Sequence, residues 1–266
     1  MSNYTQLLNN LDHLKLLKFK EILPGYLDDA LQKNKSFVDI LKELTDKEVE
    51  FREERARLIN LTISHFPYYK TIDDFDFSYQ PSINKPQILD LLSLRFVEHF
   101  DNILLIGNSG VGKTHLATAL GIEASSKRIS TYFIHFNTLM QEFKVAASEG
   151  TVDKVVKHYL KYKLLVIYES GYLPVEKDAA NGFFQLVAAR YERRPKIITS
   201  SLPLSKWGEV FGDYTIANAI IDRLVHHSHI IKITGQSYRI KGKILIENDK
   251  DWPSSLTYIF DRYKTT

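Results

Sequence analysis

The sequence predicts an α/β fold, in which a mostly parallel sheet is flanked by helices and preceded by a small all-α region. From about residue 87 the chain alternates short apolar strands with helices, a pattern typical of a parallel sheet covered on both faces. Residues 3–65 instead show apolar residues at helical spacing and little strand character. A glycine-rich phosphate-loop pattern follows the first apolar strand. We therefore expect a helical N-terminal domain over 1–65, a linker over 66–86 and a nucleotide-binding domain over 87–266.

The N-terminal region is expected to contain several helices. Leucines recur at helical spacing over 7–14, and Pro24-Gly25 is expected to interrupt the pattern. Residues 46–63 predict a long charged helix, for which Asp46 is a plausible N-cap. The stretch 65–86 holds two prolines, several aromatic residues and short polar segments. That composition favours an extended linker packed against the next domain.

The remainder of the chain supplies strands and helices in turn. Four strands are predicted, at 102–107, 131–136, 164–168 and 196–201. Helices are predicted from about 112, between the second and third strands up to about 161, and over 178–193 and 215–227. HIIKITG and SYRIKGKIL, near the end, are expected to add a further strand or a hairpin.

Composition and charge limit the classes of function. The 266 residues are 44% hydrophobic and 25% charged, which is typical of a globular protein. No apolar run approaches the ~20 residues that cross a bilayer, and the N-terminus lacks a secretory signal pattern. The chain has no cysteine, which excludes disulfides and thiolate metal sites and suits a reducing cytoplasm. Residues 1–75 carry 11 Lys/Arg and 13 Asp/Glu, whereas the remainder carries 24 and 19, a balance that permits a polyanionic partner without requiring one.

GNSGVGKT, residues 107–114, matches the phosphate-loop pattern in full and stands between a strand and a helix. Its glycines let backbone amides surround phosphates, and the helix N-terminus adds partial positive charge. Lys113 is expected to reach the β- and γ-phosphates, and the Thr114 hydroxyl to coordinate Mg²⁺. A chance match is the alternative, which the strand and helix context disfavours. The predicted ATP-binding residues are Gly107, Asn108, Ser109, Gly110, Val111, Gly112, Lys113, Thr114 and His115.

A carboxylate follows the third predicted strand. Phosphate-loop proteins hold their magnesium partly through an acidic residue at the tip of a neighbouring strand. In LLVIYE the carboxylate is Glu169, the candidate for orienting and deprotonating the attacking water and for an indirect contact with Mg²⁺. An ordinary surface carboxylate is the alternative. Tyr168 stands where an aspartate is expected, and a neutral phenol cannot replace that charge.

The phosphate loop, LLVIYESGYLP, RYERRPKIITSSLPLSKWGEVFGD, AIIDRLVHH and GQSYRIK occur in one order, together with the FP…DFDF linker. With these motifs the chain resembles, over essentially its whole length, the IstB-like family of AAA+ ATPase helpers of insertion-sequence transposition. That family is related to the DnaC-type helicase loaders. The resemblance implies an AAA+ core that assembles head to tail into a homo-oligomer with ATP at the subunit interfaces. It also implies binding to duplex DNA and delivery of the target site to a partner transposase.

The resemblance also implies roles for individual residues. Lys113 and Thr114 match the Walker A pair, and Glu169 matches the Walker B glutamate. Arg223 matches the family's arginine finger, which reaches a neighbouring subunit's ATP, and Arg239 matches the sensor-2 arginine. A guanidinium suits both roles because it donates several fixed hydrogen bonds to phosphate oxygens. A surface salt bridge remains the alternative for each arginine.

Two positions depart from the family pattern, and both belong to the hydrolytic machinery. Tyr168 replaces the Walker B aspartate, and Ser201 replaces the sensor-1 asparagine that usually helps to position the attacking water. We expect these changes to weaken hydrolysis more than ATP binding. A degenerate copy of the element or a sequence error are alternative explanations.

The segment 151–163 is the first candidate for DNA contact. It predicts a helix with an apolar stripe beside a basic one, formed by Lys154, Lys157 and Lys161. In the initiator-like AAA+ branch the helices inserted here face DNA, so the resemblance favours sequence-neutral phosphate contacts. An ordinary solvated face is the alternative. Lys144, in the preceding helix, is a weaker candidate.

Two further clusters attract attention. Arg193 and Arg194 are basic, but cations also favour helix C-termini without any partner. His226, His227 and His229 lie close in sequence, but no carboxylate cluster or metal-type spacing accompanies them, so a metal site is not expected.

Three functions compete. The first is an ATP-dependent transposition helper that oligomerises on duplex target DNA, remodels it and recruits the transposase. The second is an ATP-gated adaptor of the helicase-loader type that binds ATP but barely hydrolyses it. A small-molecule kinase is the third, but no substrate pocket or lid is evident in the sequence. The N-terminal match and the DFDF linker favour the first.

Overall fold

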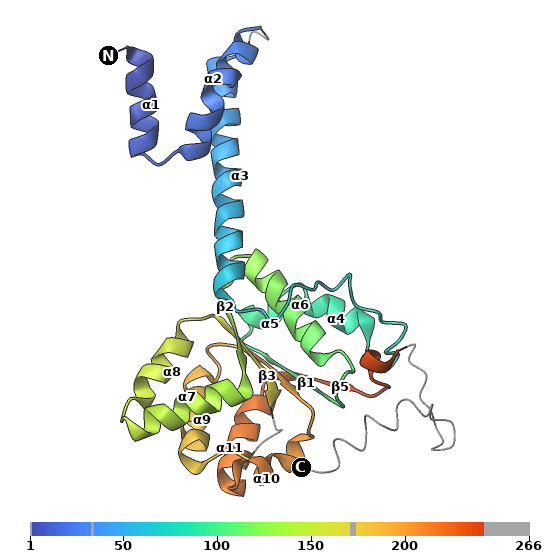
Figure 1. The fold of residues 1–266 in the computed structure, drawn as a ribbon. Coiled ribbons are helices and arrows are strands. Elements are labelled where there is room, and N and C mark those ends of the chain that lie inside the picture. The colour runs from blue at the N-terminus through green and yellow to red at the C-terminus, as the bar shows by residue number, and fades with distance from the viewer. Residues whose placement is uncertain (1, 33–34, 171–173, 242–266) are drawn as a thin grey trace, which may run out of the picture.

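The computed structural model describes residues 2–32, 35–170 and 174–241. Within them lies a five-stranded sheet with the order β2-β3-β4-β1-β5, in which every pairing is parallel (Figure 1). The predicted α/β fold with a parallel sheet flanked by helices is confirmed. The strands are β1 Asn102–Gly107, β2 Thr131–His135, β3 Leu164–Ser170, β4 Lys196–Ser200 and β5 Ser228–Ile233.

Helices precede, connect and flank the strands. The N-terminal helices are α1 Asn3–His13, α2 Leu17–Gln32 and α3 Phe37–Ile63. The helices around the sheet are α4 Lys85–Leu91, α5 Arg95–Glu98, α6 Lys113–Ser126, α7 Phe136–Ser148, α8 Val152–Leu160, α9 Lys177–Arg190, α10 Trp207–Phe211 and α11 Tyr214–Val225. Two short 3₁₀ turns are η1 Leu204–Lys206 and η2 Tyr238–Ile240.

The strands divide their side chains between the two faces of the sheet. In β3, Leu164 and Val166 join the cluster formed with α4, α5 and α6, whereas Leu165 and Ile167 join the cluster formed with α7 to α11. Successive side chains of a β-strand point to opposite faces of the sheet. Both faces carry apolar side chains here, since helices cover both of them. All five strands are parallel, so their carboxyl ends lie at one edge of the sheet.

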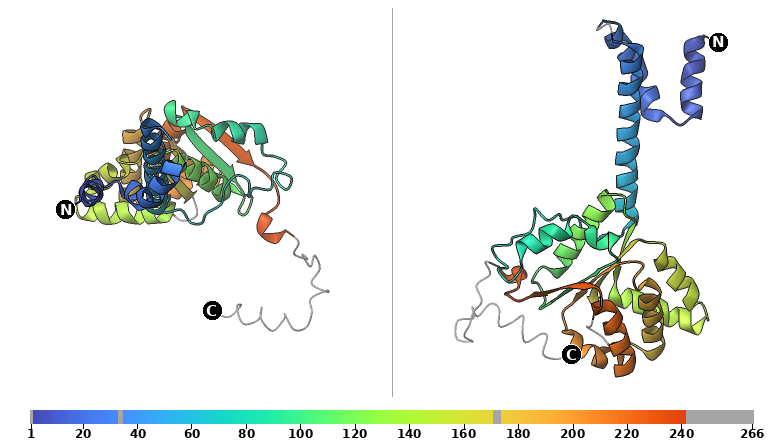
Figure 2. Two further views of the ribbon diagram at one scale, coloured as in Figure 1. Left: turned by 90° about the horizontal axis from the view of Figure 1, so that it is seen from above. Right: turned by 180° about the vertical axis from the view of Figure 1, so that it is seen from behind.

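Helix α3 is a long stalk that carries α1 and α2 away from the sheet (Figures 1 and 2). The expectation that this helix begins at Asp46 is wrong. It begins at Phe37, where the Ser36 hydroxyl accepts a hydrogen bond from the backbone N–H of Asp39, and Asp46 instead pairs with Lys42 one turn away. The helix extends further because Ile40 and Leu44 pack on α2 before the charged stretch starts.

Pro24-Gly25 does not interrupt the N-terminal helices, contrary to expectation. Both residues lie inside α2. A proline there removes one backbone hydrogen bond and a glycine disfavours the helix by about 1 kcal/mol. Phe19 and Leu23, which precede Pro24-Gly25 in α2, are buried against Leu44 of α3, so apolar packing keeps the helix continuous.

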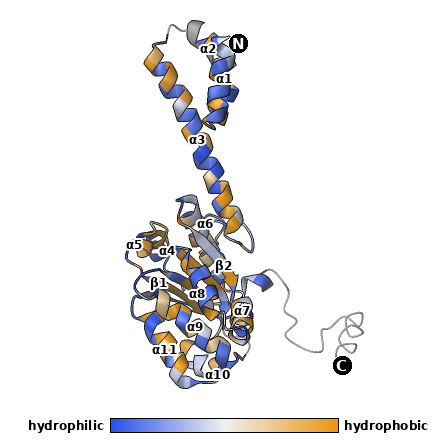
Figure 3. Cartoon of the chain, turned by 90° about the vertical axis from the view of Figure 1, so that its left-hand side faces the viewer, coloured by the Kyte–Doolittle hydropathy of each residue, from blue (hydrophilic) through white to orange (hydrophobic). Residues whose placement is uncertain are grey.

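Buried polar contacts join α3 to α2 near its midpoint and to the sheet at its C-terminal end. Near α2, the carboxylate of Glu48 accepts the backbone N–H groups of Lys18 and Phe19, two donors that the first turn of a helix leaves without partners. At the sheet, the Ser64 carbonyl accepts the N–H of Phe133 in β2, and the Ser64 hydroxyl meets that of Ser125 in α6. The charged part of α3 between these two contacts is hydrophilic (Figure 3).

The C-terminal segments only partly follow the prediction. Residues 228–233 form the expected further strand, which pairs with β1 in parallel. Tyr238–Ile240 is a 3₁₀ turn, and the rest of SYRIKGKIL from residue 242 lies outside the described residues. The helix predicted over 178–193 ends at Arg190, and the one predicted over 215–227 spans Tyr214–Val225. None of the described helices combines the length and apolar character needed to span a membrane.

Candidate nucleotide site

The phosphate loop joins the end of β1 to the start of α6, at the carboxyl edge of the sheet. Gly110 and Gly112 have φ angles of 78° and 101°, a region that residues with side chains rarely adopt. Space also requires glycine at both positions. A Cβ atom on Gly112 would lie 2.6 Å from the Phe75 ring, and one on Gly110 would lie 1.9 Å from the Ser237 hydroxyl. The loop is therefore enclosed by the linker on one side and by the segment that follows β5 on the other.

A single cavity brings most of the predicted site residues together. Its lining comprises Tyr68, Lys70, Asp74, Phe75, Asp76, Gln80, Ser109, Gly110, Val111, Gly112, Lys113, Thr114, His115, Glu169, Ser201, Tyr238 and Arg239. The two earliest loop residues, Gly107 and Asn108, do not line this cavity, but their carbonyls contact the Lys113 side chain. The predicted phosphate loop, Walker B glutamate, sensor-1 serine and sensor-2 arginine thus surround one space.

Lys113 supplies the positive charge of the loop. The residue is 7% exposed, and its Nζ donates to the carbonyls of Gly107 and Asn108 at 2.6 and 2.7 Å. Burial and, to a smaller extent, the nearby charge of Arg239 lower the pKa of Lys113 to about 8, while the charge of Glu169 acts in the opposite direction. An anion in this cavity would favour the charged form of the amine.

The next two residues of α6 differ in orientation. Thr114 lines the cavity beside Lys113. His115 also lines the cavity, but its ring contacts the linker, because its Nε2 lies 2.8 Å from the Thr71 carbonyl and the ring meets Phe75 edge-on at 5.2 Å. The Thr114 hydroxyl and the Glu169 carboxylate are oxygen donors, which is the chemistry that Mg²⁺ prefers. The chemistry of these residues therefore fits the predicted metal, which Thr114 would hold directly and Glu169 indirectly.

Glu169 occupies an irregularity at the end of β3. The register against β4 shifts between Ile167 and Ser170, so β3 has one extra residue there. Glu169 has a φ angle of 61°, and its backbone N–H donates to the Thr199 hydroxyl at 3.0 Å. Its Oε2 lies 2.9 Å from Nε2 of His135, the last residue of β2. The bulge turns this carboxylate into the cavity, where a histidine meets it.

Tyr168, the residue before it, lies outside the cavity lining. Its ring packs partly against the apolar cluster on the α6 side of the sheet and meets the His135 ring edge-on at 5.1 Å. Burial raises the pKa of the Tyr168 phenol, and the charge of Glu169 raises it further. The side chain is therefore neutral at physiological pH and supplies no negative charge next to Thr114.

The two predicted arginines lie in different places. Arg239, on η2, lines the cavity. Arg223, on α11, does not line it; its guanidinium donates to the Ala219 carbonyl and lies over the Phe184 ring at 4.9 Å. In a single chain Arg223 is thus separate from the phosphate loop, as a residue that acts on another subunit would be.

The linker contributes more to the cavity than its sequence indicated. Asp76 pairs with Lys241 at 2.6 Å, the Tyr79 hydroxyl donates to the Ser237 carbonyl, and the Gln80 amide donates to the Gln236 carbonyl. These bonds join the linker to the segment that carries Arg239. Sequence reasoning missed these residues and also His135, although the position of His135 at the end of an apolar strand is a usable signal.

The predicted DNA-contacting lysines lie away from the cavity. Lys154 and Lys157 are exposed on α8, opposite the buried Val156 and Tyr159, and Lys161 is exposed just after it. Within the described residues, no carboxylate forms an ion pair with any of these three. Lys144 on α7 differs, because its Nζ pairs with Glu176 at 2.6 Å.

A family described as IstB-like ATP binding protein matches residues 9–245. This chain belongs to that family. One IstB-like relative, from insertion sequence IS232 of Bacillus thuringiensis subsp. berliner, is 48% identical over 93% of this chain and 99% of its own length. Another, from insertion sequence IS21 of Pseudomonas aeruginosa, is 35% identical over 88% of each chain. Their names describe both, provisionally, as ATP-binding proteins, and the predicted family is confirmed.

Solved structures with the same fold include replication proteins. The crystal structure of the DnaI aligns with a TM-score of 0.53 at 20% identity, covering 62% of the IstB-like chain and 91% of DnaI. AMPPCP-bound DnaA from Aquifex aeolicus aligns with a TM-score of 0.51 at 19% identity, covering 66% and 54%. At these identities the likeness concerns the fold alone, and it agrees with the predicted parallel sheet flanked by helices.

Proposed function

We propose that this protein is an ATP-dependent DNA-binding helper of transposition, which assembles on duplex target DNA, remodels it and recruits a partner transposase. One observation carries the proposal. A single cavity holds the phosphate loop, Glu169, Ser201 and Arg239 in a chain of the IstB-like family. The insertion-sequence names of its relatives support transposition as the process that it serves. We place this activity in the cytoplasm.

Different cavity residues serve phosphate binding, metal binding and the activation of water. The amides of residues 109–113 and the Lys113 ammonium bind the phosphates, and Arg239 adds a second cation to the cavity lining. Mg²⁺, when bound, neutralises charge on the β- and γ-phosphates, and the Thr114 hydroxyl would hold it. Glu169 accepts a proton from the attacking water, and Ser201 hydrogen-bonds that water.

Arg223 is proposed to act in a neighbouring subunit. Its guanidinium is half-exposed on α11 and lies outside the cavity of its own chain. A head-to-tail homo-oligomer would place it at the ATP of the next subunit, where it stabilises the charge that develops during hydrolysis. ATP binding and assembly would thereby depend on each other.

Duplex DNA is proposed to contact the exposed lysines of α8. Lys154, Lys157 and Lys161 form a basic surface, and within the described residues no carboxylate neutralises it. Lys144 is the weaker candidate, since Glu176 competes for its charge. We further propose that the helical domain over 1–65 serves DNA and partner contact, that 66–86 is a linker and that 87–266 is the ATP-binding domain.

A second candidate is an ATP-gated adaptor of the helicase-loader type, in which ATP is only an assembly ligand. The neutral Tyr168 beside Glu169 favours it, because the strand end then carries one carboxylate in place of two. The two candidates differ in hydrolysis and partner, while they share ATP binding and assembly.

The decisive experiment measures the ATPase rate and the size of the DNA-bound oligomer for the parent protein and for Lys113→Ala. We expect assembly on duplex DNA with ATP, slow turnover, and loss of both in the variant. If Lys113→Ala assembled on DNA as well as the parent, ATP gating would be refuted. Added purified transposase from the same element distinguishes the two candidates, because only the helper would stimulate strand transfer.

The DNA surface is tested by removing its charge. In the variant, Lys154, Lys157 and Lys161 are changed to alanine. A plot of the logarithm of the DNA-binding constant against the logarithm of the salt concentration should become less steep, by about 0.9 in slope for each phosphate that the variant no longer neutralises. A matched control removes three other exposed charges, at Lys127, Lys206 and Lys232. Equal effects of the two triple variants would contradict a DNA site on α8.

A further inference from the structure

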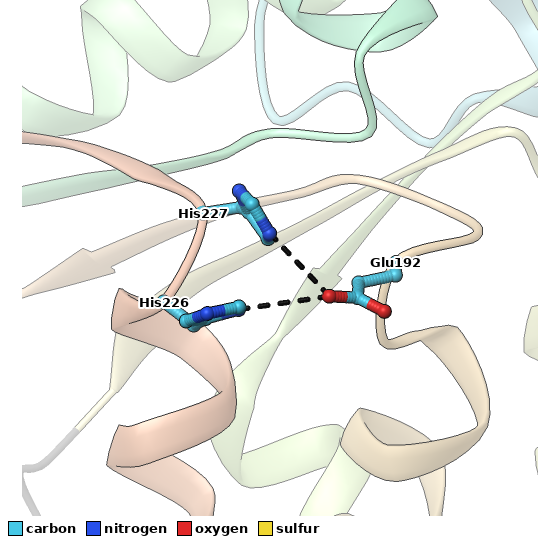
Figure 4. A group of neighbouring side chains, drawn as sticks. All are labelled: Glu192, His226 and His227. Atoms are coloured by element: carbon cyan, nitrogen blue, oxygen red, sulfur yellow. Dashed lines mark ion pairs between the residues drawn. The ribbon is translucent and has the colours of Figure 1, made fainter.

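Three exposed side chains converge at the edge of the sheet opposite the phosphate loop. His226 caps the C-terminal end of α11, His227 follows it, and Glu192 lies in the turn between α9 and β4 (Figure 4). One ligand atom from each of the three lies within 4.8 Å of the others. The sequence shows no carboxylate cluster or metal-type spacing around these histidines, because Glu192 is distant in sequence and is brought beside His226 and His227 only by the fold.

The backbone holds this cluster in place. The His227 carbonyl accepts the N–H of Asn102 at 2.7 Å, which fixes the start of β5 beside the start of β1. Glu192 has a φ angle of 51°, in a turn that the buried Arg190 anchors through hydrogen bonds. The cluster lies at the amino edge of the parallel strands, whereas the nucleotide cavity lies at the carboxyl edge. The two sites are therefore separate.

The two spacings between the carboxylate and the imidazoles suit a tetrahedral metal. Glu192 Oε1 lies 3.4 Å from His227 Nε2 and 3.6 Å from His226 Nδ1. Two ligands at Zn–N and Zn–O distances near 2.0–2.1 Å on a tetrahedron are separated by about 3.4 Å. Two imidazoles and one carboxylate form a common zinc ligand set that leaves one position for water.

We propose that Glu192, His226 and His227 form a binding site for a divalent transition ion, with Zn²⁺ as the fitting ion. The Tyr191 hydroxyl, 2.7 Å from His226 Nδ1, would give way to the metal. A bound ion would clamp the turn before β4 to the end of α11, the helix that carries Arg223 three residues earlier. The site is independent of the proposed ATP chemistry.

The test is titration of tag-free, full-length protein with Zn²⁺ alone, followed by calorimetry, and with Co²⁺, followed by its visible spectrum. We expect one equivalent to bind, a tetrahedral cobalt spectrum and a rise in melting temperature. Glu192→Gln and His227→Ala should each weaken binding about tenfold or more. Glu192 and His227 are both exposed, so circular dichroism should show that each variant keeps the fold of the parent.

His229→Ala is the matched control. His229 lies two residues away and pairs with Asp101 at 3.6 Å, outside the cluster. Its loss should leave zinc affinity unchanged. Absence of binding by the parent, or equal affinity in the parent and the His226→Ala/His227→Ala double variant, would overturn the proposal and leave the three residues as a surface ion-pair cluster.

Discussion

Nε2 of His135 lies 2.9 Å from Oε2 of Glu169, so the end of β2 is joined to the bulge at the end of β3. This contact occupies one oxygen of the carboxylate that is proposed to activate water. The hydrogen bond holds this oxygen against the imidazole, so it limits the positions in which Glu169 can face the attacking water. The histidine therefore restrains Glu169, and its removal should change the chemical step more than ATP binding.

We predict that His135→Ala raises the steady-state ATPase rate by up to about tenfold, since one hydrogen bond contributes about 1 kcal/mol. The ATP dissociation constant should change less than twofold, because His135 does not line the cavity. Turnover by a coupled phosphate assay and affinity by calorimetry check both. His158→Ala, an exposed histidine on α8, is the control and should leave turnover unchanged. A fall in turnover with His135→Ala would show that the contact aligns Glu169.

Tyr168 gives the second prediction. The phenol is neutral, because burial raises its pKa and Glu169 raises it further. We expect Tyr168→Asp to increase Mg²⁺-dependent hydrolysis about tenfold or more, since it restores a second carboxylate beside the metal position. Tyr168→Phe keeps the ring without adding charge and should behave as the parent. If the parent hydrolysed ATP rapidly and the aspartate variant gained nothing, Tyr168 would be shown to be no defect.

Lys113 gives a prediction about pH. Its folded-state pKa is about 8, because burial and the charge of Arg239 disfavour the ammonium form. Phosphates favour that form, so bound ATP raises the pKa of Lys113. Affinity should therefore be constant below pH 8 and fall above it, by at most tenfold for each pH unit. Calorimetric titrations with ATP from pH 6.5 to about 9.5 measure this change.

Lys113→Arg is the control for that pH dependence. A guanidinium stays protonated over the whole range, so any remaining slope belongs to ATP or to other groups of the protein. If ATP affinity fell with pH equally in the parent and in the arginine variant, deprotonation of Lys113 would not be the cause of the fall.

The core of the site was predictable from local sequence, whereas the surroundings were not. The phosphate loop places Lys113 and Thr114 by a contiguous pattern, because strand, turn and helix are dictated by neighbouring residues. Glu169 was predictable as a strand end, but its contact with His135 depends on which strands are neighbours in the sheet. The single-residue bulge that orients Glu169 leaves no signature in LLVIYES.

Contacts between residues that are distant in sequence explain the other differences between the sequence predictions and the structure. Asp76 and Lys241 are far apart in sequence, as are Glu192 and His226, and periodicity cannot reveal either pair. At Pro24 local propensity predicted an interruption, but tertiary packing of Phe19 and Leu23 prevailed. Composition and motif thus predicted the fold class and the nucleotide loop, and the contacts between distant segments required the structure.

Arg190 gives a prediction about stability. It is fully buried, and its guanidinium donates to four backbone carbonyls, those of Tyr159, Tyr162, Lys163 and Pro195, at 2.8–3.1 Å. It thereby joins the end of α9 to the segment before β3 and to the start of β4.

Arg190→Leu would remove the guanidinium donor from all four carbonyls, and the Pro195 carbonyl would keep only the long hydrogen bond from the Leu165 N–H. We expect the free energy of unfolding to fall by about 3–5 kcal/mol, because each buried acceptor that loses its partner is costly. Urea denaturation followed by circular dichroism measures the loss. Arg193→Leu, which removes an exposed arginine three residues later, should change stability by less than about 0.5 kcal/mol. A loss below about 1 kcal/mol for Arg190→Leu would mean that water or rearranged backbone satisfies the carbonyls, and that the guanidinium is not what holds these three segments together.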